Sequence, residues 1–207
     1  MLLWTIQPEE IWDILRKKGV YRCDPDRCGF LQMEKYKPQF DPAYDWLVHQ
    51  MEKRIGEKPK GVRFPVWAWY QFAGKHDADL RKERWEHGTE GEHMVCLNIE
   101  VPDEQVLLSD FHLWHYVLNR WAISDSEEEA NRFDEYLEHI EKDKADAFLH
   151  KNWERIFDIA PFRNEWTSRG DDIQATFWEL KRENVKKVRF FTTAKRKTIF
   201  LPVREHG

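Results

Sequence analysis

The sequence predicts an α+β fold with a mostly antiparallel sheet, and two features of the pattern lead to this prediction. Segments rich in β-branched and aromatic residues lie near both ends of the 207-residue chain, whereas its middle shows helical periodicity. Strands and helices therefore do not alternate as they would in a parallel βαβ sheet. No repeat or flexible linker divides the chain, so we expect a single domain over residues 1–207.

A short strand and two helices are expected in the first part of the chain. Residues 2–6 (LLWTI) have the composition of a strand. A helix near 8–18 follows, because Pro8 suits a first helical turn and Gly19 suits a helix end. A second helix, from Asp41 to Gly56, carries one apolar stripe.

Further strands are expected at 62–70, 94–101, 105–108, 173–180, 185–192 and 198–203. Pro65 should move the first of these to a sheet edge or a bulge. Residues 73–93 are expected to form a long polar loop that includes one helical turn, and loops of this length are often functional. Helices are expected from Ser109 or Asp110 to about residue 122, and again within 126–158.

Composition excludes several classes of protein. Aromatic residues make up 14% of the chain, which a disordered protein would lack. No apolar run approaches the ~18 residues of a membrane span, and the start lacks the basic region of a signal peptide. The net charge of -5 gives the protein as a whole no electrostatic attraction to nucleic acid. Three cysteines, an odd number, favour reduced thiols in the cytoplasm.

The cysteines do not predict a metal site. Cys23 and Cys28 are not spaced as a usual zinc pair, although His87, His93 and Cys96 could join them in principle. We therefore expect three small buried thiols and no metal.

Eleven tryptophans predict an aromatic cleft that could stack a planar ring. Alternation in a strand places Trp67 and Trp69 on one face, and Tyr70 follows them. Trp114 belongs to the helix after Ser109. The alternative is that these rings only fill the core.

The segment 108–119 (LSDFHLWHYVLN) carries side chains that make specific hydrogen bonds: Asp110, His112, His115 and Asn119. A histidine near a carboxylate could form an acid/base pair. The simpler interpretation makes Asp110 a helix N-cap and His115 an interior histidine. No nucleophile motif or Gly-rich phosphate loop accompanies them, which disfavours a hydrolase triad and the P-loop and Rossmann folds.

Glu179 follows two aromatic residues in a predicted strand, five positions after Gln174. A carboxylate in such surroundings could be desolvated and held for catalysis. Alternatively, Glu179 marks the solvent face at the strand end, beside Lys181 and Arg182.

Charge is distributed unevenly, with acids concentrated in 125–146 and bases in 181–204. The basic segment could bind the phosphates of a nucleotide or of a nucleic acid. The structural alternative is a solvated acidic helix face, and lysines that protect an edge strand from aggregation.

Several motifs together resemble an uncharacterised bacterial domain family of about this length, and the likeness covers nearly the whole chain. They are LWTIQP (3–8), PVWAWYQF (65–72), DLR (79–81), VPDEQVLLSDFHLWHYVLN (101–119), WERIFD (153–158) and IQATFWEL (173–180). This resemblance implies kinship but no activity.

A more distant resemblance is to the ADP-ribosyltransferase fold, through the order of Thr5, the helix closing at Gly19, Tyr70 and Glu179. It implies NAD as cofactor, with Tyr70 and neighbouring tryptophans such as Trp67 stacking the nicotinamide and Thr5 holding the adenosine side. Glu179 would stabilise the oxocarbenium-like sugar. The sequence departs from the family pattern at two positions, with Trp4 where His is expected and Phe177 where Gln is expected.

The same resemblance implies that Arg22 or Arg81 faces the pyrophosphate. The alternative function is a non-enzymatic module that recognises a protein, a nucleic acid or a small ligand through the aromatic cleft. A Glu179 within hydrogen-bond reach of a nucleotide-sized pocket lined by Tyr70 would favour the enzyme. Burial of Glu179 against lysines, or its exposure on an edge, would favour the binding module.

Overall fold

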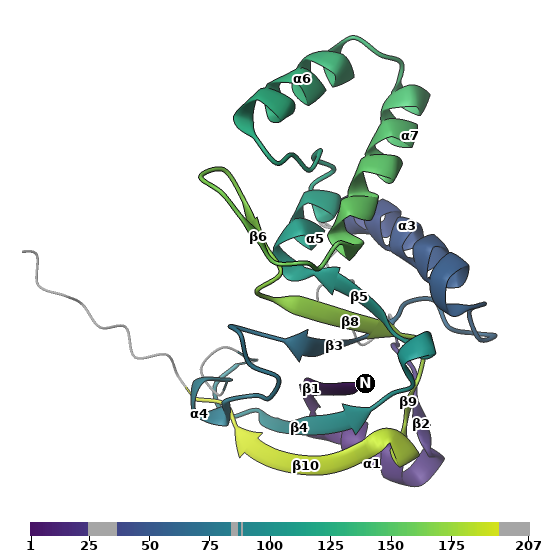
Figure 1. The fold of residues 1–207 in the computed structure, drawn as a ribbon. Coiled ribbons are helices and arrows are strands. Elements are labelled where there is room, and N and C mark those ends of the chain that lie inside the picture. The colour runs from purple at the N-terminus through teal and green to yellow at the C-terminus, as the bar shows by residue number, and fades with distance from the viewer. Residues whose placement is uncertain (25–36, 84–86, 88, 195–207) are drawn as a thin grey trace, which may run out of the picture.

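The computed structural model, which describes residues 1–24, 37–83, 87 and 89–194, has the α+β fold expected from the sequence. Its main sheet has six strands in the order β10-β4-β1-β3-β8-β5, and every neighbouring pair is antiparallel (Figure 1). The strands are β1 (Leu2–Pro8), β3 (Val66–Gln71), β4 (His93–Glu100), β5 (Leu107–Asp110), β8 (Ile173–Phe177) and β10 (Val185–Thr192).

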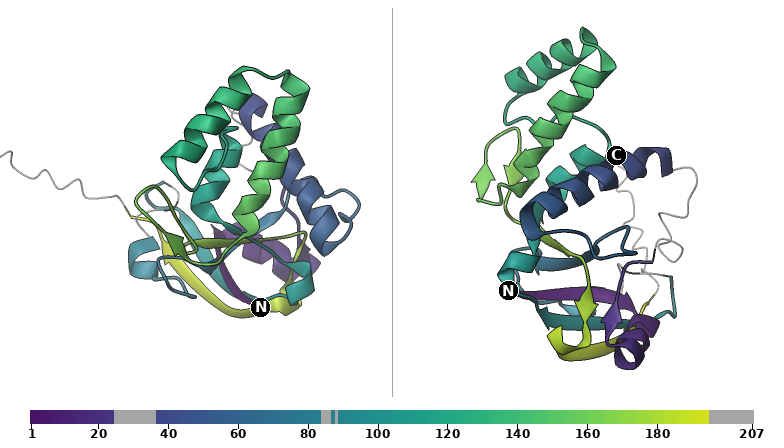
Figure 2. Two further views of the ribbon diagram at one scale, coloured as in Figure 1. Left: turned by 45° about the horizontal axis from the view of Figure 1, so that its top comes forward. Right: turned by 90° about the vertical axis from the view of Figure 1, so that its right-hand side faces the viewer.

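Helices and two small ribbons complete the described structure. The α-helices are α1 (Glu9–Lys18), α3 (Lys37–Ile55), α4 (Leu80–Glu83), α5 (Phe111–Leu118), α6 (Glu127–Glu138) and α7 (Lys142–Asn152). The 3₁₀ helices are η2 (Asp103–Gln105), η3 (Trp153–Phe157) and η4 (Arg182–Asn184). The ribbons pair β2 (Val20–Tyr21) with β9 (Leu180–Lys181), and β6 (Phe162–Arg163) with β7 (Ser168–Arg169). Helices α6 and α7 run side by side and project away from the sheet (Figures 1 and 2).

The strand register assigns each side chain to one face of the sheet. Trp67 lies opposite Thr176, and Trp69 lies opposite Gln174. Directly opposed residues share a face, and neighbours along a strand alternate, so Trp67, Trp69 and Gln174 lie on the same face. The expectation that the two tryptophans share a face is confirmed.

The two faces of the sheet have different cores. On one face, Leu15 of α1 packs with residues such as Leu97 and Phe177. On the tryptophan face, α3, α5, α7 and η3 build the largest cluster, which includes Trp114 and Trp153. A smaller cluster on that face contains Trp4. The aromatic residues therefore do fill a core, but one region of it, described below, stays open.

The expected helix boundaries are largely confirmed, although α5 ends at Leu118 rather than near residue 122. Helix α1 ends at Gly19, whose φ of 75° is left-handed and whose N–H bonds the Leu15 carbonyl. Ser126 caps α6 by accepting a hydrogen bond from the Glu129 N–H. Helix α3 begins at Lys37 rather than at Asp41, so Pro42 lies inside it. Proline lacks an N–H, so Pro42 cannot make the helical hydrogen bond to the carbonyl four residues before it.

Some strand predictions need correction. Strand β3 is an interior strand, because it lies between β1 and β8. Pro65 does not force it to an edge, because the strand begins one residue later and Pro65 therefore has no ladder bond to donate. The strand does have a register shift, but it lies between Trp69 and Gln71 rather than at Pro65. The predicted strand 173–180 divides into β8 and β9, which belong to different sheets. The predicted strand 198–203 lies outside the described residues.

Candidate functional site: an aromatic cavity on the tryptophan face

An apolar cavity of about 400 Å³ opens on the tryptophan face of the sheet. Most of its exposed lining is apolar, and its volume lies within the usual range of small-molecule sites. The described residues that line it are Phe40, Tyr44, Trp67, Phe111, Trp114, His115, Leu118 and Gln174. The structure thus brings together four of the residues singled out in the sequence, namely Trp67, Trp114, His115 and Gln174.

Three elements hold the aromatic walls of this cavity. Trp67 comes from β3, Tyr44 from α3 and Trp114 from α5. The centroids of Trp67 and Trp114 lie 5.4 Å apart, and Tyr44 packs edge-on against Trp114 at 5.5 Å and against Trp67 at 6.3 Å. Edge-to-face packing of this kind is favourable and fixes the orientation of the rings. The walls are therefore preformed.

Two polar atoms of the cavity walls are buried without a hydrogen-bond partner: the indole Nε1 of Trp67 and the amide Oε1 of Gln174. Ser109, opposite Gln174 on β5, has a third such atom, its Oγ. A buried polar atom without a partner costs about 1–3 kcal/mol. Native proteins satisfy most such groups, so a ligand could supply the missing bond to a side chain that lines the cavity once its polar end turns toward the ligand.

Asp110 is a fully buried N-cap that anchors the cavity wall. Its Oδ1 accepts a hydrogen bond from the Leu113 N–H at 3.0 Å, which starts α5. Its Oδ2 accepts from the Gly170 N–H at 2.7 Å, which ties α5 to the loop before β8. The simpler interpretation of Asp110 is confirmed.

The other polar residues of segment 108–119 stabilise α5 and its surroundings. His112 Nε2 contacts Asp172 Oδ2 at 2.9 Å. Asn119 is the C-cap and donates to the His115 carbonyl at 2.7 Å. His115 is exposed rather than interior, because its position on α5 faces the cavity instead of the core. Its Nδ1 lies 2.9 Å from the Phe111 carbonyl.

Glu179 lies elsewhere, in an ion pair with Arg22. Both Nε and Nη2 of Arg22 donate to Glu179 Oε1 at 2.6 Å, and the Glu179 side chain is only 19% exposed. Arg22 itself borders a different cavity of about 620 Å³, formed beside α1 and β2. The Glu179 carboxylate is therefore already neutralised by a cation, here an arginine rather than the lysines expected.

Three further candidates do not meet at the aromatic cavity. Thr5 is buried, and its Oγ1 donates to the Trp67 carbonyl at 2.9 Å, so it braces β1 against β3. Tyr70 packs against the cluster on the α1 face, opposite to the face of Trp67. Arg81 is 91% exposed and pairs with Asp79 at 3.2 Å. A single ring could not contact both Tyr70 and Trp67 across the sheet.

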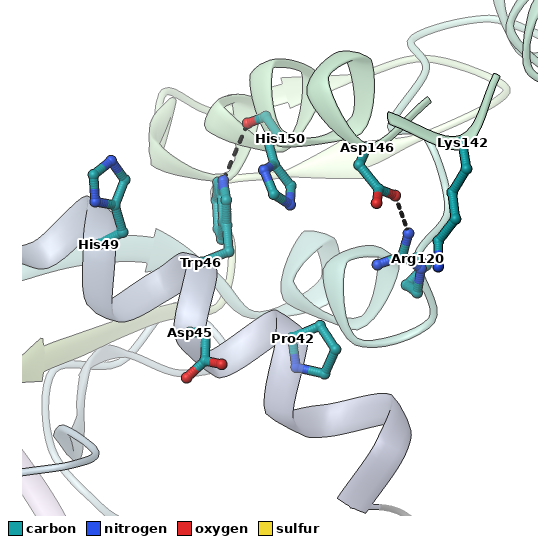
Figure 3. Close-up of a pocket in the computed structure, with 8 residues that line it drawn as sticks. All are labelled: Pro42, Asp45, Trp46, His49, Arg120, Lys142, Asp146 and His150. Atoms are coloured by element: carbon teal, nitrogen blue, oxygen red, sulfur yellow. Dashed lines mark hydrogen bonds and ion pairs between the residues drawn. The ribbon is translucent and has the colours of Figure 1, made fainter. Parts of the chain in front are cut away.

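A second cavity, of about 590 Å³, lies between α3 and α7 and is polar in character (Figure 3). Arg120 and Asp146 form an ion pair at its wall, His150 lies one turn after Asp146 on α7, and His49 comes from α3 (Figure 3). Desolvation lowers the pKa of His150, while Asp146 acts in the opposite direction. Trp46 is the one tryptophan among its described lining residues, whereas several aromatic rings line the cavity on the tryptophan face, so the aromatic cavity is the better site for a planar ligand.

The two described cysteines differ in burial. Cys96 is buried and Cys23 is partly exposed, so Cys23 departs from the expectation of buried thiols; Cys28 lies outside the described residues. Among the described residues, no group of three or more His, Cys, Asp and Glu side chains could hold a metal ion.

Several bases of segment 181–204 have structural partners. Lys186 pairs with Glu100 at 2.8 Å, and the Arg182 guanidinium lies over the Trp12 ring. Strand β10, which carries part of the segment, is an edge strand as expected. Residues 195–204 lie outside the described part of the chain.

Four residues that line the cavity were not predicted from the sequence as site residues: Phe40, Tyr44, Phe111 and Leu118. Tyr44 belongs to the apolar stripe of α3, a pattern that indicates burial but cannot distinguish a filled core from an open cavity.

No helix in the described ranges is long and apolar enough to cross a membrane.

Comparison with known proteins gives one result. The model of the family described as a domain of unknown function (DUF3841) matches residues 2–186. No curated protein and no solved structure matches the chain. The expected kinship with an uncharacterised family is confirmed, because the match spans most of the sequence. The protein therefore belongs to the DUF3841 domain family.

Proposed function

We propose that this protein binds a nucleotide, NAD or another, by inserting the planar ring of the ligand into the aromatic cavity. The observation that carries the proposal is the cavity itself: about 400 Å³ walled by Tyr44, Trp67, Phe111 and Trp114, with an amide and a histidine at its wall. Rings of this kind stack on planar ligands, and the few polar groups orient them.

The energetics favour a ring over a flexible chain. A planar heterocycle loses little conformational freedom when it binds, and the preformed walls need little rearrangement. Burial of its faces against tryptophan and tyrosine removes apolar surface from water on both partners. His115 is exposed at the cavity and could contact the sugar or a phosphate.

Isothermal titration calorimetry with NAD, AMP and adenosine tests the proposal. We expect binding by the wild type and a large loss of affinity in Trp67→Leu, because that substitution removes one stacking wall. Trp166→Leu is the matched control, since Trp166 is 47% exposed and lies on the β6–β7 ribbon. The proposal fails if none of the three ligands binds at millimolar concentration to a folded wild-type protein.

Catalysis by an ADP-ribosyltransferase mechanism is a further step, which depends on Glu179. Its pairing with Arg22 gives no support to a role at the aromatic cavity, so we favour the binding module. NAD turnover separates the two functions. Nicotinamide release that Glu179→Gln abolishes would establish the transferase, whereas NAD binding without turnover would leave binding alone.

We further propose a cytoplasmic location, on the basis of the low and odd cysteine content. A protein or a nucleic acid as the partner of the aromatic cavity is less favoured, because the cavity has the dimensions of a single small ligand.

A further inference from the structure

We propose that Gln174 selects the ligand, and that the ring it selects presents a hydrogen-bond donor beside an acceptor on one edge. The amino-pyrimidine edge of adenine and the carboxamide of nicotinamide both have this chemistry. This inference rests on the proposed function, because it concerns the same cavity, and it adds the identity of the group that is recognised.

The position of Gln174 suits such a role. It lies in β8, an interior strand, where Trp69 opposes it on one side and Ser109 on the other. The backbone at this position is held by neighbouring strands on both sides, so the side chain starts from a fixed point at the cavity wall. Sites built on sheet strands orient their polar groups more precisely than sites built on loops.

The missing hydrogen bond of Gln174 supports the same role. Gln174 Oε1 is buried and has no hydrogen-bond partner, although the side chain lines the cavity. The Nε1 of Trp67, on the adjacent strand, is a second buried atom without a partner. The indole N–H lies in the plane of a ring on which the ligand is proposed to stack, so it does not face the ligand edge; a ligand donor placed against Gln174 would give Oε1 the hydrogen bond that it lacks.

The chemistry of a carboxamide fits this class of edge. A glutamine side chain is planar and carries one acceptor oxygen and a two-proton donor nitrogen side by side. It can pair with the adjacent donor and acceptor of adenine, or with another carboxamide, through two parallel hydrogen bonds. A ring without the donor would leave Oε1 unpaired in an apolar cavity, where an unmade bond is most costly.

The experiment compares two pairs of ligands by calorimetry. Adenosine is paired with purine riboside, which lacks the exocyclic amino group, and nicotinamide is paired with 3-acetylpyridine, which has a methyl group in place of the amide nitrogen. A preference within the first pair would identify adenine as the group that is recognised, and a preference within the second pair would identify the nicotinamide carboxamide. We expect the ligand with the complete edge to bind at least about tenfold more tightly in one pair or in both.

Variant proteins then assign the preference to Gln174. Gln174→Met should remove the preference within the pair, because methionine has a similar length but no amide. It should not lower the melting temperature, since the buried amide oxygen makes no hydrogen bond that the fold would lose. Gln105→Met makes the same chemical change at an exposed position of η2 outside the cavity and should preserve the preference.

Three outcomes bear on the inference. A preference that is present in the wild type and in Gln105→Met but lost in a folded Gln174→Met supports it. Equal binding within each pair, or a preference that survives Gln174→Met, overturns it while the proposed ring binding stands. Absence of binding by all four ligands overturns both.

Discussion

Replacement of Asp110 by alanine should destabilise the protein strongly, because its carboxylate satisfies two backbone donors at a buried site. The Leu113 N–H would lose its cap, at a cost of about 1 kcal/mol. The Gly170 N–H would be left without its acceptor, at a cost of about 1–3 kcal/mol. We therefore expect a loss of about 2–4 kcal/mol in the free energy of unfolding.

Urea unfolding followed by tryptophan fluorescence and by circular dichroism measures this loss. A melting experiment should agree, at about 2–4 °C per kcal/mol for a chain of this size. Asp110→Asn keeps one acceptor oxygen and should lose about half as much. Asp134→Ala, at an exposed position of α6, is the control and should change stability by less than about 0.5 kcal/mol. If Asp110→Ala matched that control, the assignment of Asp110 as a structural cap would be refuted.

Three other predictions follow from single contacts. Gly170→Ala should cost at least about 1 kcal/mol more than Gly61→Ala in urea unfolding, and equal costs would contradict this. Both glycines have positive φ, but an added Cβ at Gly170 would lie 2.7 Å from the Pro161 Cα, whereas no atom lies within 4 Å at Gly61. Burial raises the pKa of Cys96 to about 11, so iodoacetamide at about pH 8 should leave Cys96 unmodified until the protein unfolds, as peptide mass spectrometry can show. The same shift contributes stability that is complete below the unfolded pKa and is lost as the pH rises through about 11. Burial alone would raise the pKa of Glu129, but hydrogen bonds outweigh it and the net shift is downward. Its contribution to stability is therefore present above the ordinary pKa of 4.5 and is lost as the pH falls through the lower folded value. Glu129→Gln should lose less stability than the wild type between about pH 6 and pH 3, and parallel losses would show that this shift is unimportant.

Much of the local structure could be predicted from the sequence, because helix and strand signals act over a few residues. Gly19, Ser126 and Asp110 set helix ends through their own backbone preferences and side-chain caps. The shared face of Trp67 and Trp69 follows from the period of a strand. The errors also have local causes: Pro65 lies one residue before β3, and the sequence does not show on which side of a proline a strand begins.

The candidate site could be predicted only in part. Trp67, Trp114, His115 and Gln174 attract attention by residue type, and all four line one cavity. Thr5, Tyr70 and Arg81 attracted attention through the order of motifs in a distant family, and they lie apart from it. Order along the chain does not fix which face of a sheet a residue occupies, whereas strand register does.

The sequence by itself determined the α+β class, the family, most helix ends and the residue types available for ring stacking, because these depend on composition, short-range periodicity and similarity along the chain. The tertiary structure alone decided that Glu179 pairs with Arg22, that Tyr70 and Trp67 lie on opposite faces, and that residues of α3, α5 and the sheet line one open cavity. These contacts join residues distant along the chain, so they depend on the register of β3, β5 and β8 and on how the helices pack, which no local pattern encodes.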